Sequence, residues 1–332
     1  MNNLQLGIAT AGVSLAFFGH TLSAQPLNQH LLTPGIWVGQ GAMYDGTGNS
    51  LLSTYSMTKT ITQASAESFN VNLQVTSGSG TVYTSKDLWR QSAPTQFVVS
   101  GSDKGHVEFF GNHTLYSTFT IPNGHTLQST TLLDHDSGAI RVLLREWNGA
   151  TCIRFYAEKY SRLSRSTQST FLPRTRSLAS GFLSTLTGKA KKEPGQALWI
   201  STGTAYDSTG QDVAYTYKLN TLYSASENGM FMTYLTQGTT SLGKEWVLQG
   251  VLAAMAQNRI VMTGSQTGYI VLFPTDVGES LYFASAKLAA SQEWQVTFGL
   301  SSPKSSHSLT LLSDSTGLVK NYLQADSHAV QD

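Results

Sequence analysis

The stretch Gly35-Ile36-Trp37-Val38-Gly39-Gln40-Gly41-Ala42-Met43-Tyr44-Asp45 occurs twice in this chain. It returns 162 residues later as Ala197-Leu198-Trp199-Ile200-Ser201-Thr202-Gly203-Thr204-Ala205-Tyr206-Asp207. The tryptophan, one glycine and the Tyr-Asp pair are identical in both copies, and a Thr-Gly pair follows each. A repeat of this length is typical of a duplicated domain, because solenoid repeats have periods of roughly 20 to 50 residues. The sequence therefore predicts two copies of one domain.

Length and composition agree with two domains. The 332 residues are too many for one comfortable core and fit two domains of about 150 residues each. The charge is nearly balanced, with 21 Lys and Arg against 20 Asp and Glu, and charged residues make up only 12% of the chain. This composition argues against a nucleic-acid partner, which would require a surplus of basic side chains.

The first 24 residues have the pattern of a secretory signal peptide. Leu4 to Phe18 is apolar, and Leu22-Ser23-Ala24 is suitable for cleavage, although only the terminal amine is positive before the apolar run. We therefore expect an exported protein, periplasmic or extracellular, with residues 25–34 as a lead-in. Cys152 is the sole cysteine, which excludes an intrachain disulfide and favours a small core residue over a reactive thiol.

Both copies have the pattern of antiparallel β-structure. Apolar residues alternate with polar ones, and turn sequences such as Asp45-Gly46-Thr47-Gly48 and Pro122-Asn123-Gly124 separate the runs. In the first copy this predicts strands at 35–43, 52–62, 68–76, 81–91, 96–100, 106–110, 114–121, 125–134, 139–147 and 151–160. The predicted fold is all-β: two tandem antiparallel up-and-down barrels of about ten strands each, spanning residues 35–163 and 194–332.

The later strands of the two copies can be aligned at an offset of 166 residues. This alignment places Leu115-Tyr116 on Leu281-Tyr282 and Tyr156 on Tyr322. A rival register, in which Thr131-Leu132-Leu133-Asp134 matches Thr310-Leu311-Leu312-Ser313, would leave the second copy one hairpin out of step. We interpret the rival match as similar hairpin chemistry.

Residues 164–193 form a predicted linker of different composition. From Ser161 to Lys192 the chain has seven basic residues and no acidic one, and Leu178, Phe182, Leu183 and Leu186 have helical spacing. We interpret this segment as a basic helix that closes or braces the first barrel. The alternative is a peripheral membrane contact through residues 174–192.

The Gly35-Ile36-Trp37 opening resembles the Gly-x-Trp motif of the calycin superfamily, the lipocalins and their relatives. The second copy departs from the motif with Ala197 and Ser201 where the first has glycines. The resemblance implies that Trp37 and Trp199 each plug a barrel end, with a basic residue of a late strand across the ring; Arg154 and Lys320 stand at the corresponding positions. The longer pattern Gly-x-Trp-x-Gly-x-Gly, which begins at Gly35, resembles that of lipocalin-like bacterial proteins of uncharacterised function, some of which are tandem.

Several motifs that suggest catalysis or metal binding lack a required residue or have a simpler structural explanation. Gly238 to Lys244 has P-loop spacing, but Glu245 follows where Ser or Thr must hold magnesium. Asp134-His135-Asp136 lies in a tight turn and is better explained by solvated turn residues than by a metal site. Asp45 and Asp207 are explained by side-chain capping of the turn that follows each.

No cofactor is expected. His113 and His125 are the candidate ligands if one barrel holds haem, but His106 is matched by Tyr269, so no histidine role is shared by the two copies. With no acid–base pair at defined spacing, the sequence favours a non-enzymatic role.

The remaining functional prediction is a barrel interior that holds a small hydrophobic or amphipathic molecule. The predicted contact residues are aromatic: Tyr55, Phe97, Tyr116, Phe119, Tyr156, Tyr217, Tyr234 and Tyr282. The alternative is a structural or interaction module of the cell envelope whose barrels are filled by their own side chains. Whether the barrels contain a cavity or are filled by their own side chains therefore distinguishes a carrier from a structural module.

Overall fold

A computed structural model gives the fold of the chain and describes residues 32–111, 113–133, 139–163, 179, 182–183, 186, 195–226, 231–275 and 279–330. The predicted signal peptide, Asp134-His135-Asp136 and most of the linker lie outside these residues. Within the described segments, no helix has the length and apolar character needed to cross a membrane.

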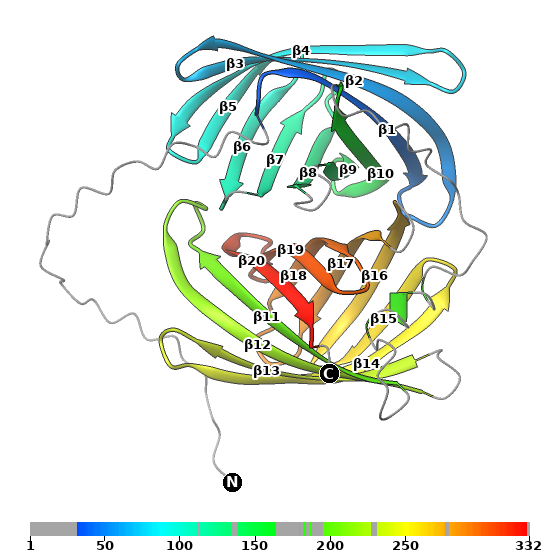
Figure 1. The fold of residues 1–332 in the computed structure, drawn as a ribbon, viewed down its shortest axis with the longest axis vertical. Coiled ribbons are helices and arrows are strands. Elements are labelled where there is room, and N and C mark those ends of the chain that lie inside the picture. Colours follow the sequence, from blue (N-terminus) through cyan, green and yellow to red (C-terminus); the bar gives the residue numbers. More distant parts are fainter. Residues whose placement is uncertain are drawn as a thin grey trace, which may run out of the picture.

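The first ten strands close into one antiparallel barrel, in which each strand pairs with its sequence neighbours and the first also pairs with the tenth (Figure 1). The strands are β1 (Gly35–Asp45), β2 (Leu51–Ser65), β3 (Ser68–Ser77), β4 (Val82–Ala93), β5 (Gln96–Gly101), β6 (Lys104–Phe110), β7 (Thr114–Thr120), β8 (Thr126–Leu133), β9 (Ile140–Asn148) and β10 (Thr151–Arg162).

The second barrel repeats this plan, with its first strand paired to its second and its last. Its strands are β11 (Gln196–Tyr206), β12 (Val213–Ala225), β13 (Phe231–Thr240), β14 (Glu245–Ala256), β15 (Arg259–Gly264), β16 (Gln266–Pro274), β17 (Ser280–Leu288), β18 (Trp294–Ser301), β19 (Ser305–Ser313) and β20 (Val319–Ala329). The prediction of two tandem ten-strand barrels is confirmed. Closure leaves neither sheet with an open edge that could pair with another chain.

The same turn follows the first strand of each barrel. Asp45 Oδ1 accepts hydrogen bonds from the Thr47 backbone N–H (3.1 Å), the Thr47 hydroxyl (2.7 Å) and the Asn49 N–H (3.0 Å). Asp207 holds Thr209 and Gln211 in the same way. Burial, the largest single effect, opposes ionisation of both aspartates, but the hydrogen bonds together outweigh it and hold each pKa below its usual range. Turn capping therefore accounts for both acids.

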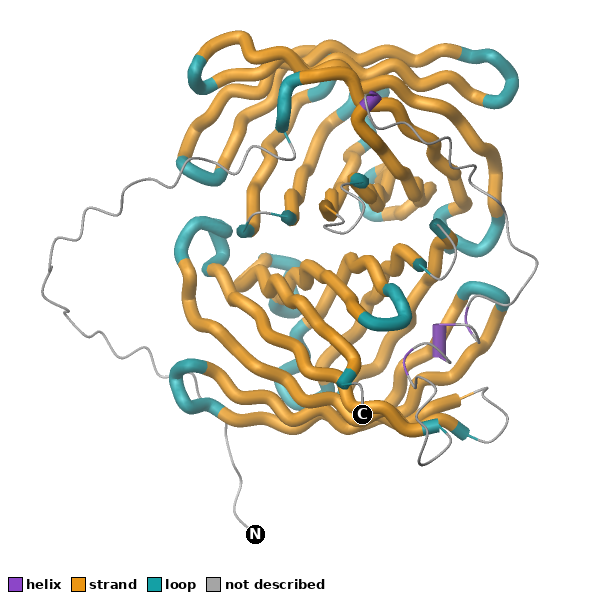
Figure 2. Tube along the Cα trace, viewed as in Figure 1, coloured by secondary structure: helices purple, strands orange, loops and turns teal. Residues whose placement is uncertain are grey.

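Each conserved tryptophan is anchored to the segment that precedes its barrel. The Trp37 indole N–H donates to the Thr33 carbonyl (3.2 Å), and the Trp199 indole donates to the Leu186 carbonyl (2.7 Å). Ala179, Phe182, Leu183 and Leu186 have helical backbone, and Figure 2 shows short helical pieces beside the second barrel. The side chains of these four residues are buried in its core. The segment between the barrels thus braces the second barrel, whereas the sequence suggested the first. The four described side chains of this segment are buried inside the molecule.

The expected partners of these tryptophans are wrong. The strand ladder places Trp37 opposite Arg162 and places Arg154 opposite Asp45, at the other end of β1. Trp199 lies opposite Ala329, also far from Lys320. Arg154 pairs instead with Glu146 (3.1 Å) and Lys320 with Glu293 (3.2 Å). Arg162 is the basic residue at the Trp37 end, where its guanidinium donates to the Pro34 carbonyl (2.9 Å).

The two barrels pack against each other (Figure 1). The interface between them is rich in aromatic side chains, and its turn contacts are reciprocal. The Gly48 turn of the first barrel meets Val271 and Phe273 of β16, and the Gly210 turn of the second meets Glu108 and Phe110 of β6. The Asn258 amide donates to the Gly48 carbonyl (2.6 Å), and Arg141 pairs with Glu279 (3.0 Å). The duplicated turn is therefore the docking element on both sides.

The ladder corrects the alignment of the later strands by one residue. Phe155 lies opposite Tyr44 and Tyr322 lies opposite Tyr206, so Tyr322 corresponds to Phe155 rather than to Tyr156. A one-residue slip moves a side chain to the other face of a sheet. Tyr116 and Tyr322 accordingly point outward and meet at the interface, with ring centroids 6.0 Å apart.

Candidate ligand-binding site in the second barrel

Two adjoining cavities lie inside the second barrel. The first, about 200 Å³, is beneath the end covered by Trp199, Phe182 and Leu186. The second, about 260 Å³, continues toward Tyr217 and Trp246. Both are lined by Ser201, Gln266 and Ser327, so they meet at these side chains. The interior therefore offers space along much of the barrel's length.

Strand alternation explains which residues face these cavities. Small residues leave room for large rings: a Cβ on Gly203 would lie 2.3 Å from the Tyr217 ring, and one on Gly299 would lie 2.2 Å from the Tyr282 ring. The Tyr217 ring therefore packs directly on the backbone of Gly203, and the Tyr282 ring packs on that of Gly299. Glycine at 203 and 299 is thus what allows tyrosines to cross the interior.

The walls of both cavities are uncharged and rich in hydroxyl groups. The Gln266 amide donates to Gln295 (2.6 Å), the Ser327 hydroxyl to Ser201 (2.7 Å), and Thr297 pairs with Thr310 (2.8 Å). Burial raises the pKa of Tyr217, Tyr223 and Tyr282, so these phenols stay protonated and can donate hydrogen bonds. Such a surface can recognise neutral polar groups together with an apolar body.

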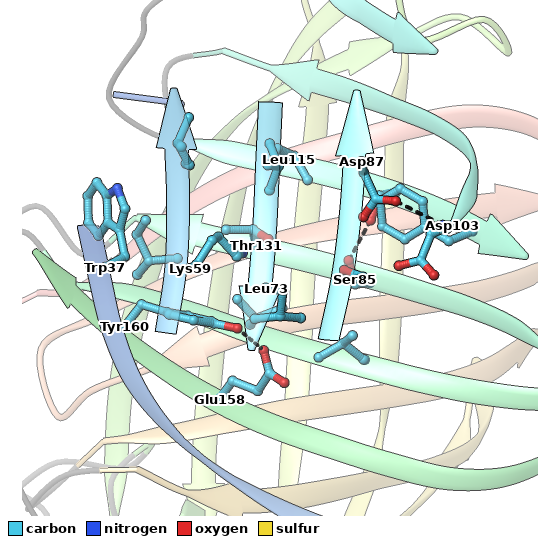
Figure 3. A pocket seen from close by; sticks show the side chains of 18 of the residues that line it. Trp37, Lys59, Leu73, Ser85, Asp87, Asp103, Leu115, Thr131, Glu158 and Tyr160 are labelled. Atoms are coloured by element: carbon cyan, nitrogen blue, oxygen red, sulfur yellow. Dashed lines mark hydrogen bonds between the residues drawn. The ribbon is translucent and has the colours of Figure 1, made fainter. Parts of the chain in front are cut away.

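The first barrel has a smaller and charged interior. Its cavity is about 130 Å³ and is lined by apolar side chains together with Lys59, Glu158, Asp87 and Asp103 (Figure 3). The Glu158 carboxylate accepts hydrogen bonds from Tyr55 (2.9 Å) and Tyr160 (3.0 Å). The Lys59 ammonium lies 4.5 Å from the centre of the Tyr160 ring. Burial raises the pKa of Glu158 and lowers that of Lys59, and each charge partly offsets the effect on the other.

A carboxylate pair lies at the other end of this cavity, away from Trp37 (Figure 3). Asp87 accepts a hydrogen bond from the Asp103 backbone N–H (2.8 Å). Burial, followed by repulsion from Asp87, raises the pKa of Asp103 to about 6. The first barrel therefore has charged groups at both ends of its cavity.

A third polar cluster of the first barrel surrounds Glu146, which is 2% exposed. Its carboxylate accepts from His125 (2.6 Å), Arg154 (3.1 Å) and the Tyr156 hydroxyl. Burial opposes ionisation of Glu146, but the three donors outweigh it and hold the pKa of Glu146 below its usual range. Each partner of this carboxylate is thus held in place by it, as in a structural network.

The predicted contact residues divide sharply between the barrels. Tyr217, Tyr234 and Tyr282 line the cavities of the second barrel. In the first barrel only Phe119 lines the cavity. Phe97 packs between Phe69 and Phe109 in the core, while Tyr55 and Tyr156 face the interior but bind its own carboxylates. Tyr116 lies in the interface between the barrels, since its ring contacts Phe298.

Sequence reasoning missed the uncharged polar residues of the site, three serines and a glutamine. Ser201, Gln266, Ser301 and Ser327 line the cavities, and nothing in their local sequence distinguishes them from turn or surface residues. Alternation along each strand could have placed them inward, but only with the correct register.

The histidines named as possible haem ligands lie away from the described cavities. No group of three or more His, Cys, Asp or Glu side chains is arranged to hold a metal ion among them. His125 is engaged with Glu146, and neither His113 nor His125 lines the cavities described above.

Comparison with known proteins shows the fold. No family model matches the chain, and no curated protein matches it. The structure is similar to that of a protein of unknown function from the DUF3598 family of Nostoc punctiforme, with a TM-score of 0.58 and 11% identity, over 92% of this chain and 99% of that one. An S-type phycobiliprotein lyase from Guillardia theta matches 42% of this chain and 92% of its own length, with a TM-score of 0.32 and 9% identity. The first similarity covers both barrels.

Proposed function

We propose that this chain is an exported, non-enzymatic, lipocalin-like binding protein that holds a small amphipathic molecule inside its second barrel. The observation that carries the proposal is the pair of adjoining cavities of about 200 and 260 Å³, lined by aromatic rings, Ser, Thr and Gln. Small-molecule sites are typically concave, mostly apolar and furnished with a few polar groups that fix orientation. Export is proposed from the leader-like pattern of residues 1–24.

The second barrel suits this role better than the first. In the first barrel, Phe69, Phe97 and Phe109 fill part of the interior, and the remaining cavity is about 130 Å³. This filled interior favours a structural role for the first barrel, which supports the second through the shared interface. An envelope or interaction module with no ligand is the alternative function for the whole chain.

A non-enzymatic role is supported by the site itself. Among the described residues that line the two cavities there is no Asp, Glu, Lys, Arg or His. General acid–base catalysis near neutral pH most often uses His, Asp, Glu or Lys, and burial raises the pKa of Tyr217, Tyr223 and Tyr282, which disfavours these tyrosines as bases. The cavity of the second barrel is equipped to bind a molecule rather than to exchange protons with it.

Native mass spectrometry of the protein purified from its own host, beside an organic extract of the same sample, tests the proposal. We expect a retained small mass that also appears in the extract. The variant Ser308→Phe, which fills the second cavity, should lose the adduct. Val142→Phe, at the equivalent ladder position of the first barrel, should keep it.

A protein that carries no adduct, and that takes up no lipid or haem when challenged, would contradict the carrier function and support the structural module. Loss of the adduct with Val142→Phe alone would assign the ligand to the first barrel instead.

A further inference from the structure

One buried hydroxyl in the second barrel has no hydrogen-bond partner within the described chain. Ser301 is 3% exposed, its Oγ is among the unpaired buried atoms, and the residue lines the cavity beneath Trp199. Buried polar groups are nearly always hydrogen-bonded, and an unpaired one is destabilising. The ladder places Ser301 opposite Ser306, and the equivalent residue of the first barrel is Leu133, opposite Ile140. The fold therefore accepts an apolar side chain here, and the hydroxyl needs another explanation.

Further hydroxyls face the same cavity as Ser301. Ser306 lies across the ladder and exchanges a hydrogen bond with the Tyr282 hydroxyl (3.4 Å). Tyr223 and Tyr234 also line this cavity. A hydroxyl can donate one hydrogen bond and accept others, so these groups can serve a carbonyl, an ether or an alcohol equally well.

The site lacks charges where the first barrel has them. Opposite the conserved tryptophan, the first barrel has Lys59 and the second has Thr221. Opposite the conserved Gly41 and Gly203 stand Glu158 and Ala325. An ionised ligand buried here would meet no counter-charge, which is strongly unfavourable in a low-dielectric interior.

We propose that the second barrel selects uncharged ligands and that the ligand's polar group binds the Ser301 hydroxyl beneath the Trp199 end. This rests on the proposed carrier function and specifies its ligand class: a small neutral molecule with a hydroxyl or carbonyl group and an apolar body. The body extends into the adjoining cavity past Ser201 and Gln266 toward Trp246.

Three probes of equal chain length test the class: 1-decanol, decanoate and decylamine, measured by isothermal titration calorimetry against the whole mature chain at pH 7.4. We expect decanol to bind at least 10-fold more tightly than either charged probe. Decanoate or decylamine binding as tightly as decanol would overturn the inference while leaving the carrier function intact. Absence of binding by all three would contradict the carrier function itself, and the inference with it.

The variant Ser301→Ala tests the position of the polar group. Loss of one neutral hydrogen bond should weaken decanol binding roughly 2- to 10-fold. The matched control Ser285→Ala, on the outward-facing side of the neighbouring strand β17, should leave it unchanged. Unchanged binding by Ser301→Ala would show that water serves this hydroxyl and would overturn the placement.

A reversed charge preference provides an independent measurement. Thr221→Lys adds an ammonium at the position that Lys59 occupies in the first barrel. We expect this variant to bind decanoate more tightly than decanol. A variant that folds and still prefers the alcohol would overturn the view that absence of charge sets the selectivity.

Discussion

The two barrels share a backbone plan and differ in what fills it. Both have a tryptophan bonded to the preceding segment, a tyrosine crossing a bare glycine, and an aspartate-capped turn. Yet at equivalent ladder positions Lys59, Glu158 and Asp87 of the first barrel become Thr221, Ala325 and Gly250 in the second. The apolar Ile140, Val142 and Leu144 become Ser306, Ser308 and Thr310.

This difference shows which residues define the barrel and which are free to change. The end tryptophan and the Asp-x-Thr-Gly turn after the first strand are the same in both copies, since the closing indole and the capped turn serve the shared backbone. Interior side chains differ between the copies in size and charge while the barrel is kept, so the backbone plan does not require particular residues there. The interior of the first barrel holds charged side chains around a small cavity, and the interior of the second is uncharged among the described residues and has more space.

The largest expected effect comes from removing either end tryptophan. Trp37→Ala and Trp199→Ala should each cost about 3–5 kcal/mol of stability, because a buried indole is replaced by a cavity. Hydrogen-exchange mass spectrometry should show each variant loosening its own barrel first. Equal, small effects on both barrels would mean that neither tryptophan plugs an end.

Transplanting the charged pair tests whether the interiors are interchangeable. Thr221→Lys buries an ammonium without a carboxylate and should lower the free energy of unfolding by about 3 kcal/mol. Adding Ala325→Glu should restore at least about 1 kcal/mol of it, as in the first barrel. Urea unfolding of the two single variants and the double variant measures this coupling. Strictly additive losses would show that the first barrel's charges are not coupled in the same way.

The reciprocal turns should respond unequally to an added methyl group. Gly48 and Gly210 have φ angles of 75° and 73°, so alanine strains both backbones. A Cβ at 48 would also lie 2.6 Å from Val271, against 3.1 Å from Glu108 and Phe110 at 210. We expect Gly48→Ala to cost about 2–3 kcal/mol and Gly210→Ala about 1–2 kcal/mol.

Gly80→Ala is the control for the backbone contribution. Its φ is 83° and a Cβ there would meet nothing within 4 Å. If Gly80→Ala lowers the stability as much as Gly48→Ala does, the contact with Val271 adds nothing to the cost. The predicted difference between the Gly48 and Gly210 variants would then be wrong.

A smaller effect is expected from the pH dependence of the interface. Glu108 occupies the position that Val271 has in the second barrel, and burial, opposed by a hydrogen bond from Tyr322, raises its pKa to about 7. Because the folded-state pKa exceeds that of the unfolded chain, the folded state binds the proton more tightly. The contribution of Glu108 to the free energy of unfolding is therefore fully present below about pH 4.5, where Glu108 is protonated in both states. It is lost as the pH rises from there through 7, with a slope of at most about 1.4 kcal/mol per pH unit.

Glu108→Gln should flatten this part of the profile. Thermal unfolding of both proteins between pH 5 and 8 would measure it, and the difference between them isolates Glu108 from Asp103 and Glu158, whose pKa values are also raised. Parallel profiles for the two proteins would exclude Glu108 as the source.

The repeat and the turn chemistry made the strands predictable, but register limited the prediction of the site. All ten predicted strands of the first copy correspond to observed ones, since alternation and turns are local signals. The alignment matched Tyr322 to Tyr156, whereas the ladder matches it to Phe155. Tyr116, which was predicted to line the interior, lies in the interface between the barrels. For the same reason the sequence placed Arg154 beside Trp37. The ladder places Arg162 there and Arg154 at the opposite end of β1.

The sequence alone predicted the duplication, the antiparallel strands and the capped turns, because the repeat can be read directly from the chain and strands and turns depend on residues close together in it. The tertiary structure decided which barrel has space, which aromatic rings join the barrels and which serine lacks a partner. These properties depend on side chains from distant strands meeting across an interior or an interface. A single-residue change of register, invisible in composition, exchanges the two faces of a strand.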